Sequence, residues 1–136
     1  MKQNGVLLTI FVDDYDAAIA FYVDCLGLFE IVADTQTSES SRYVCVAMKA
    51  FVDKFMIHLK VPTTPGGTKL IGAQGDGEVF LTIPVDDIVA LHSKLLMKDV
   101  QFDGEIEWVP YGGGVVVSDP FGNRLSLFQH FVSRFP

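Results

Sequence analysis

The chain contains the stretch Leu8-Thr9-Ile10-Phe11-Val12-Asp13-Asp14, which recurs as Leu81-Thr82-Ile83-Pro84-Val85-Asp86-Asp87. The two copies differ only where the first has phenylalanine and the second has proline. They start 73 residues apart, from Leu8 to Leu81, which is about half of the 136-residue chain. That separation is far longer than the period of a solenoid repeat. The repeat therefore predicts two related modules in tandem.

Each copy predicts the same local structure, a buried strand followed by a helix. The apolar, β-branched stretch favours a strand, and aspartate favours the cap or turn that ends it. A carboxylate there can accept hydrogen bonds from the first free amides of the helix. The apolar positions of the two helices recur every three or four residues: Ala18, Phe21, Tyr22, Cys25 and Leu26 in the first, and Ile88, Leu91, Leu95 and Leu96 in the second. Gly27 is placed to end the first helix in a left-handed conformation.

Three strand-like segments follow each helix. In the first module they are 29–34, 42–48 and 54–61, and in the second they are 104–109, 114–118 and 124–130. Residues 62–77 carry Pro, Thr and Gly without periodicity and are interpreted as a linker or lid. We therefore predict one α+β domain, residues 1–136, with βαβββ modules at about 5–61 and 78–130.

The composition is that of a soluble globular protein, with 49% hydrophobic and 20% charged residues. A formal charge of −7 argues against nucleic acid as a partner, because a basic stripe would be expected. The apolar run before Asp13 is too short to span a membrane and lacks a signal-peptide pattern. We expect a cytoplasmic protein without membrane association, in which Cys25 and Cys45 stay reduced.

Two motifs resemble those of a known superfamily. The first is Val12-Asp13-Asp14 with Ala20-Phe21-Tyr22 and Cys25-Leu26-Gly27-Leu28, and the second is Asp119-Pro120-Phe121-Gly122-Asn123-Arg124-Leu125-Ser126-Leu127. Together they resemble the vicinal oxygen chelate superfamily of glyoxalases, bleomycin-resistance proteins and extradiol dioxygenases. The resemblance spans Val6 to Phe128. It implies βαβββ modules whose curved mixed sheets surround a cup-shaped pocket, and a homodimer.

The resemblance also implies where a metal would be held. Metal enzymes of the superfamily use four side chains, one from the first and one from the last strand of each module. Those positions are Leu7, His58, Phe80 and Ser126 in this sequence. Leucine and phenylalanine offer no lone pair, and a neutral serine is a poor ligand. His58 is the only surviving candidate, so we predict no metal and no cofactor.

Side chains of the same parity as these positions are predicted to face the pocket, because strand side chains alternate. They are Leu7, Thr9, Met56, His58, Lys60, Phe80, Thr82, Arg124, Ser126 and Phe128. His58 is interpreted either as a structural histidine bonded to Thr9 or Ser126 or as a ligand contact, with a general base as a third reading. Trp108 is interpreted as a packing residue or as a stacking surface for a planar ligand.

A mostly apolar cup with a few polar groups suits a small organic ligand. The leading hypothesis is a metal-independent binding protein of the bleomycin-resistance type that sequesters an antibiotic or aromatic compound. One alternative is a lyase, isomerase or dioxygenase of the same superfamily, acting on a small carbonyl or phenolic substrate. A second is a regulatory or assembly module with a filled pocket. No residue is assigned a catalytic role, and the ligand's charge stays open because Lys60 and Arg124 conflict with the acidic composition.

Overall fold

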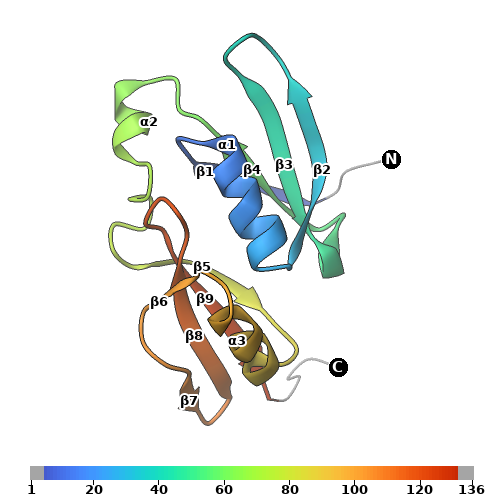
Figure 1. The fold of residues 1–136 in the computed structure, drawn as a ribbon, viewed down its shortest axis with the longest axis vertical. Helices are drawn as coiled ribbons and strands as arrows, with labels where there is room; N and C mark the ends of the chain where they lie inside the picture. Colours follow the sequence, from blue (N-terminus) through green and yellow to red (C-terminus); the bar gives the residue numbers. More distant parts are fainter. Residues whose placement is uncertain (1–4, 132–136) are drawn as a thin grey trace. The chain divides into compact units, whose positions relative to one another are not determined.

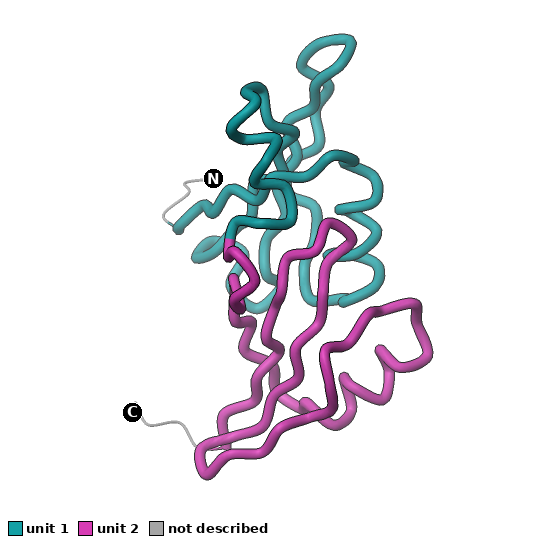
Figure 2. Tube along the Cα trace, turned by 90° about the vertical axis from the view of Figure 1, so that its left-hand side faces the viewer, with its two compact units in different colours: residues 1–74 teal, residues 75–136 magenta. Residues whose placement is uncertain are grey.

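The structure is a computed structural model and describes residues 5–131. The chain forms two compact units, residues 1–74 and 75–136 (Figure 2). Their boundary lies inside the segment 62–77 that the sequence predicts as a linker. Each unit has a mixed sheet and at least one helix, which confirms the predicted α+β class.

Unit 1 carries a four-stranded sheet in the order β1-β4-β3-β2 (Figure 1). β1 and β4 are parallel, and the other pairs are antiparallel. Its elements are β1 (Val6–Phe11), α1 (Tyr15–Ile19), the π-helical η1 (Ala20–Cys25), β2 (Phe29–Gln36), β3 (Arg42–Met48), the 3-10 turn η2 (Lys49–Phe51), β4 (Phe55–Lys60) and α2 (Pro65–Lys69).

The core of unit 1 lies between this sheet and the continuous helix of α1 and η1. Ile10 of β1, Val46 of β3 and Ile57 of β4 are fully buried. Tyr22 of η1 is also fully buried, and its ring meets that of Phe29 edge to face at 5.8 Å. The alternation of the strands explains this arrangement, because every second side chain points towards the helix. The helix ends at Cys25, and Gly27, two residues on, has the predicted left-handed conformation with a φ of 70°.

The segment predicted as an irregular linker contains structure of its own. Thr64 caps α2, and its Oγ1 accepts a hydrogen bond of 3.0 Å from the Gly67 amide. At the end of the segment, the Gln74 amide side chain binds β1. Its Oε1 accepts from the Phe11 amide at 2.8 Å, and its Nε2 donates to the Thr9 carbonyl at 3.0 Å. Gln74 thus supplies hydrogen bonds along the edge of β1 that is not paired with β4.

Unit 2 carries a sheet in the order β5-β9-β8-β6, with β7 also pairing with β8. Its elements are β5 (Val79–Pro84), α3 (Ile88–Leu96), β6 (Gln101–Phe102), β7 (Glu107–Val109), β8 (Gly112–Ser118) and β9 (Arg124–His130). β5 and β9 are parallel, and β8 is antiparallel to its neighbours. The inward side chains that pack beneath α3 include Ile83, Val115, Val117, Leu125 and Leu127.

Two details of unit 2 differ from the sequence predictions. The strand predicted at 104–109 is confined to β7, and a separate short strand, β6, lies before Gly104, whose φ is 100°. Leu96 was expected to face inward, but it is 60% exposed, whereas Leu95 is fully buried. Leu96 lies at the end of α3. None of the helices within residues 5–131 is long and apolar enough to cross a bilayer.

Candidate functional site

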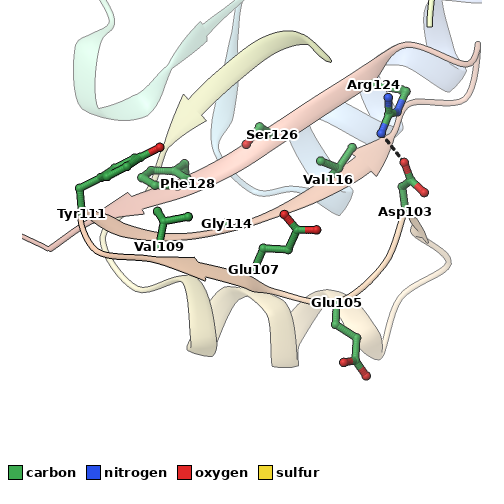
Figure 3. A pocket seen from close by; sticks show the side chains of 10 residues that line it. All are labelled: Asp103, Glu105, Glu107, Val109, Tyr111, Gly114, Val116, Arg124, Ser126 and Phe128. Carbon is green, nitrogen blue, oxygen red and sulfur yellow. Dashed lines mark hydrogen bonds and ion pairs between the residues drawn. The ribbon is translucent and has the colours of Figure 1, made fainter. Parts of the chain in front are cut away.

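A hollow of about 480 Å³ opens on one face of the unit 2 sheet (Figure 3). It lies over β7, β8 and β9 and is completed by the loop between β6 and β7. Its wall consists of Asp103, Glu105, Glu107, Val109, Tyr111, Gly114, Val116, Arg124, Ser126 and Phe128. The volume suits a small organic molecule.

Strand register explains why these side chains meet. Gly114 of β8 pairs with Phe128 of β9 on one side and with Glu107 of β7 on the other. One step along, Val116 pairs with Ser126. Residues paired directly across a sheet point to the same face, so this face gathers one row of side chains from each strand.

The glycines of β8 leave room for an aromatic wall. A methyl group at Gly114 would lie 2.6 Å from Cδ2 of Phe128, and one at Gly112 would lie 2.6 Å from its Cε1. The Phe128 ring therefore occupies space above β8 that any other residue type would fill. The ring of Tyr111 lies 5.8 Å from that of Phe128, tilted by 36°. Two aromatic rings consequently line one end of the hollow (Figure 3).

The other end of the hollow is charged. Arg124 donates from Nη2 to the Asp103 carboxylate and from Nη1 to the Gly77 carbonyl at 2.7 Å. Glu105 and Glu107 form no hydrogen bond or ion pair with any residue in the range 5–131. The hollow thus combines an engaged guanidinium with free carboxylates.

The unit 1 residues predicted to face the pocket share one face of the β1–β4 pair. They are Leu7 and Thr9 on β1, and Met56, His58 and Lys60 on β4. His58 pairs in register with Thr9 and with Cys45 of β3. Its ring lies 4.9 Å from that of Tyr43.

Two pKa values on this face of unit 1 are shifted. Partial burial, with a smaller contribution from the Lys60 charge, lowers the pKa of His58. A hydrogen bond with the Cys45 side chain, together with burial, raises the pKa of Tyr43. His58 forms no hydrogen bond within the part of the chain that the structure describes, so neither ring nitrogen is fixed by a partner there.

The remaining predicted residues lie in unit 2 at different places. Arg124, Ser126 and Phe128 line the hollow, and Thr82 pairs with Ser126 in register at its margin. Phe80 lies at an irregularity of β5. Trp108 pairs with Gly113, on the opposite face of β8, and is therefore not a wall of the hollow. Trp108 is 53% exposed, and its ring stacks on that of Phe131 with 5.7 Å between the ring centroids and an interplanar angle of 11°.

The sequence matches the family model of the Glyoxalase/Bleomycin resistance protein/Dioxygenase superfamily over residues 6–127. The chain belongs to this superfamily. A protein of Shewanella frigidimarina (strain NCIMB 400) that carries no functional name is 30% identical over 129 residues, which are 95% of each chain.

Two solved structures of the superfamily fold resemble this chain closely. One is TnmS3, an antibiotic binding protein from Streptomyces sp. CB03234, with 30% identity and a TM-score of 0.71 over 95% of this chain and 97% of that one. The other is a superfamily member from Sphaerobacter thermophilus DSM 20745, with 26% identity and a TM-score of 0.72 over 96% of this chain and 99% of that one.

The metal positions of the superfamily do not fit a divalent ion in this chain. Leu7 and Phe80 have no donor atoms, which leaves the His58 imidazole and the Ser126 hydroxyl. Within residues 5–131, no three His, Cys, Asp or Glu side chains lie together as ion ligands would. The donor set is therefore insufficient for the divalent ion of the superfamily's enzymes.

Sequence reasoning missed most of the wall of the hollow. The residues not predicted are Asp103, Glu105, Glu107, Val109, Tyr111, Gly114 and Val116. The alternation of strand side chains could have identified Glu107 and Val109, because both point to the face opposite to that of Trp108. For Asp103 and Tyr111 there was no such signal, because both lie in connections whose paths alternation does not determine.

Proposed function

We propose that the protein is a metal-independent small-molecule binding protein of the glyoxalase/bleomycin-resistance type, with the hollow of unit 2 as its ligand site. The observation that carries this proposal is the wall itself. It combines the rings of Tyr111 and Phe128 and the side chains of Val109 and Val116 with a hydroxyl and several charged groups. In concave small-molecule sites, aromatic side chains supply contact area and polar groups fix the orientation of the ligand.

The resemblance to TnmS3 supports an antibiotic or another aromatic compound as the ligand. That protein is an antibiotic binding protein and is 30% identical to this chain over nearly its whole length. Fold alone does not determine function, so the chemistry of the wall must also agree. The aromatic end agrees, because aromatic side chains offer planar ligands offset or edge-to-face contacts.

Filling the hollow tests the proposal. The variant Ser126→Phe places a ring on its floor, beside Val116. Its matched control, Ser93→Phe, makes the same change at an exposed position of α3. The probe is the neutral aromatic dye N-phenyl-1-naphthylamine, followed by its fluorescence. We expect Ser126→Phe to weaken binding by about tenfold or more and the control to bind like the wild type.

Thermal unfolding of both variants verifies that they fold. Undiminished binding by a folded Ser126→Phe protein would place the ligand elsewhere. Failure of the wild type to bind this dye, or any member of a panel of planar aromatic compounds, would contradict the proposed function as a whole.

A further inference from the structure

The charges around the hollow are unequal, and the only cation in its wall is already engaged. Three carboxylates, those of Asp103, Glu105 and Glu107, stand against the single guanidinium of Arg124. Both terminal nitrogens of that guanidinium donate to protein oxygens, one to Asp103 and one to Gly77. Arg124 therefore offers little to an anionic ligand, and it neutralises Asp103. The charge that remains for a ligand is negative.

Glu107 is the carboxylate best placed to use that charge. It pairs with Gly114, which has no side chain to shield it, and Gly114 pairs in turn with Phe128. In Figure 3 the side chain of Glu107 extends from β7 towards β8, whereas that of Glu105 extends away from β8. Glu107 has no partner within residues 5–131. A negative charge thus lies beside the aromatic wall.

We propose that the ligand class of this hollow is a planar aromatic cation, with its ring against Phe128 and Tyr111 and its positive charge at Glu107. This inference rests on the proposed function and specifies its ligand. The aromatic wall favours the same sign of charge, because ring faces are negative and attract cations. A formal charge of −7 on the whole chain also raises the local concentration of cations. An anionic ligand would be repelled by Glu107, and the guanidinium of Arg124 is already engaged and could not offset that repulsion.

Three dyes with one ring system isolate the effect of charge. They are 10-methylacridinium, a cation; acridine, which is neutral at pH 7.5; and acridine-9-carboxylate, an anion. We expect the cation to bind about fivefold tighter than acridine, since pairs exposed to solvent contribute modestly. We expect the anion to bind weakest, and the preference for the cation to decline as salt increases. Fluorescence titration at two salt concentrations measures all three dyes.

The variant Glu107→Gln removes the charge and preserves the shape of the side chain. It should bring the affinities for the cation and for acridine to within about twofold of each other. Glu30→Gln makes the same change on β2 of unit 1, at an exposed residue outside the wall of the hollow. This matched control should keep most of the preference for the cation.

The outcomes separate the ligand class from the proposed function. Equal binding of the three dyes, a preference for the anion, or an unchanged preference in Glu107→Gln would overturn the inference and leave a ligand site in place. Loss of binding to all three dyes with retained binding of N-phenyl-1-naphthylamine would do the same. Only the failure of every aromatic probe would remove the proposed function itself.

Discussion

At the scale of single residues, His58 should make the stability of the protein depend on pH. Burial and Lys60 lower its pKa, and the other groups near it are Tyr43, at its ring, and Cys45, its partner in register on β3. The folded state therefore holds the imidazole neutral where the unfolded chain would already bind a proton. The contribution of the neutral His58 to stability is fully present above the unfolded pKa of about 6.5. It is lost as the pH falls through the lower folded pKa.

The variant His58→Gln tests this dependence, because glutamine is polar and does not titrate. Urea unfolding between about pH 7.5 and pH 5 should show a smaller loss of unfolding free energy than in the wild type. His92→Gln is the control, since its ring packs on Phe102 in unit 2. If the pH profile of His58→Gln matched that of the wild type, the imidazole would be equally protonated in both states.

Gly113 separates Trp108 from the backbone of β8. A methyl group there would clash with the six-membered part of the indole ring, so we expect Gly113→Ala to lower the free energy of unfolding by about 1–3 kcal/mol. Gly66→Ala is the control, because nothing lies within 4 Å of its added carbon and alanine favours a helix. Trp108 is the only tryptophan, so its emission follows both variants. Equal stability of the two would show that the indole moves aside freely.

At the scale of elements, the repeat encodes the start of two helices. Asp14 accepts from the Ala17 amide and Asp87 from the Ala90 amide, each at 3.0 Å. Asp14→Ala and Asp87→Ala should each cost about 1 kcal/mol of stability, the usual value for a lost cap. The neighbouring Asp13→Ala and Asp86→Ala are matched controls, because both side chains are exposed. Urea unfolding of the four variants measures these losses. Equal losses of unfolding free energy in the controls and the cap variants would contradict the capping role of Asp14 and Asp87.

The same elements show what a sequence can predict. The strand, cap and helix of each module follow from local patterns, and Asp14 and Asp87 cap as the repeat indicates. α2 was missed because its proline and two glycines have low helix propensity, and this short helix depends on its Thr64 cap. The strand expected at 104–109 is shortened to 107–109, and Gly104 before it adopts a positive φ instead of a strand conformation. Local propensity does not encode such a path.

At the scale of the whole molecule, the sequence predicted the fold class and the order of the two modules, but only part of the site. Both motifs of the resemblance lie at element boundaries, where residue types are restricted by backbone conformation. Arg124, Ser126 and Phe128 were predicted by alternation and do line the hollow. The balance of charge in the hollow was not predictable, because the ion pair of Arg124 with Asp103 joins residues 21 positions apart. That pair exists only once the loop before β7 has folded back.

The superfamily's metal positions lack suitable donor atoms in this chain, so we expect the intact protein to be independent of metal. Leu7 and Phe80 replace two ligands of the superfamily's metal enzymes, and one imidazole with a serine hydroxyl binds a divalent ion poorly. We expect protein purified without chelators to contain far less than one metal ion per chain by mass spectrometry. We also expect EDTA to leave both the melting temperature and dye binding unchanged, since a bound ion would stabilise the folded state by mass action. A stoichiometry near one, lost together with stability in His58→Gln, would establish an ion at His58 and favour an enzyme of the superfamily.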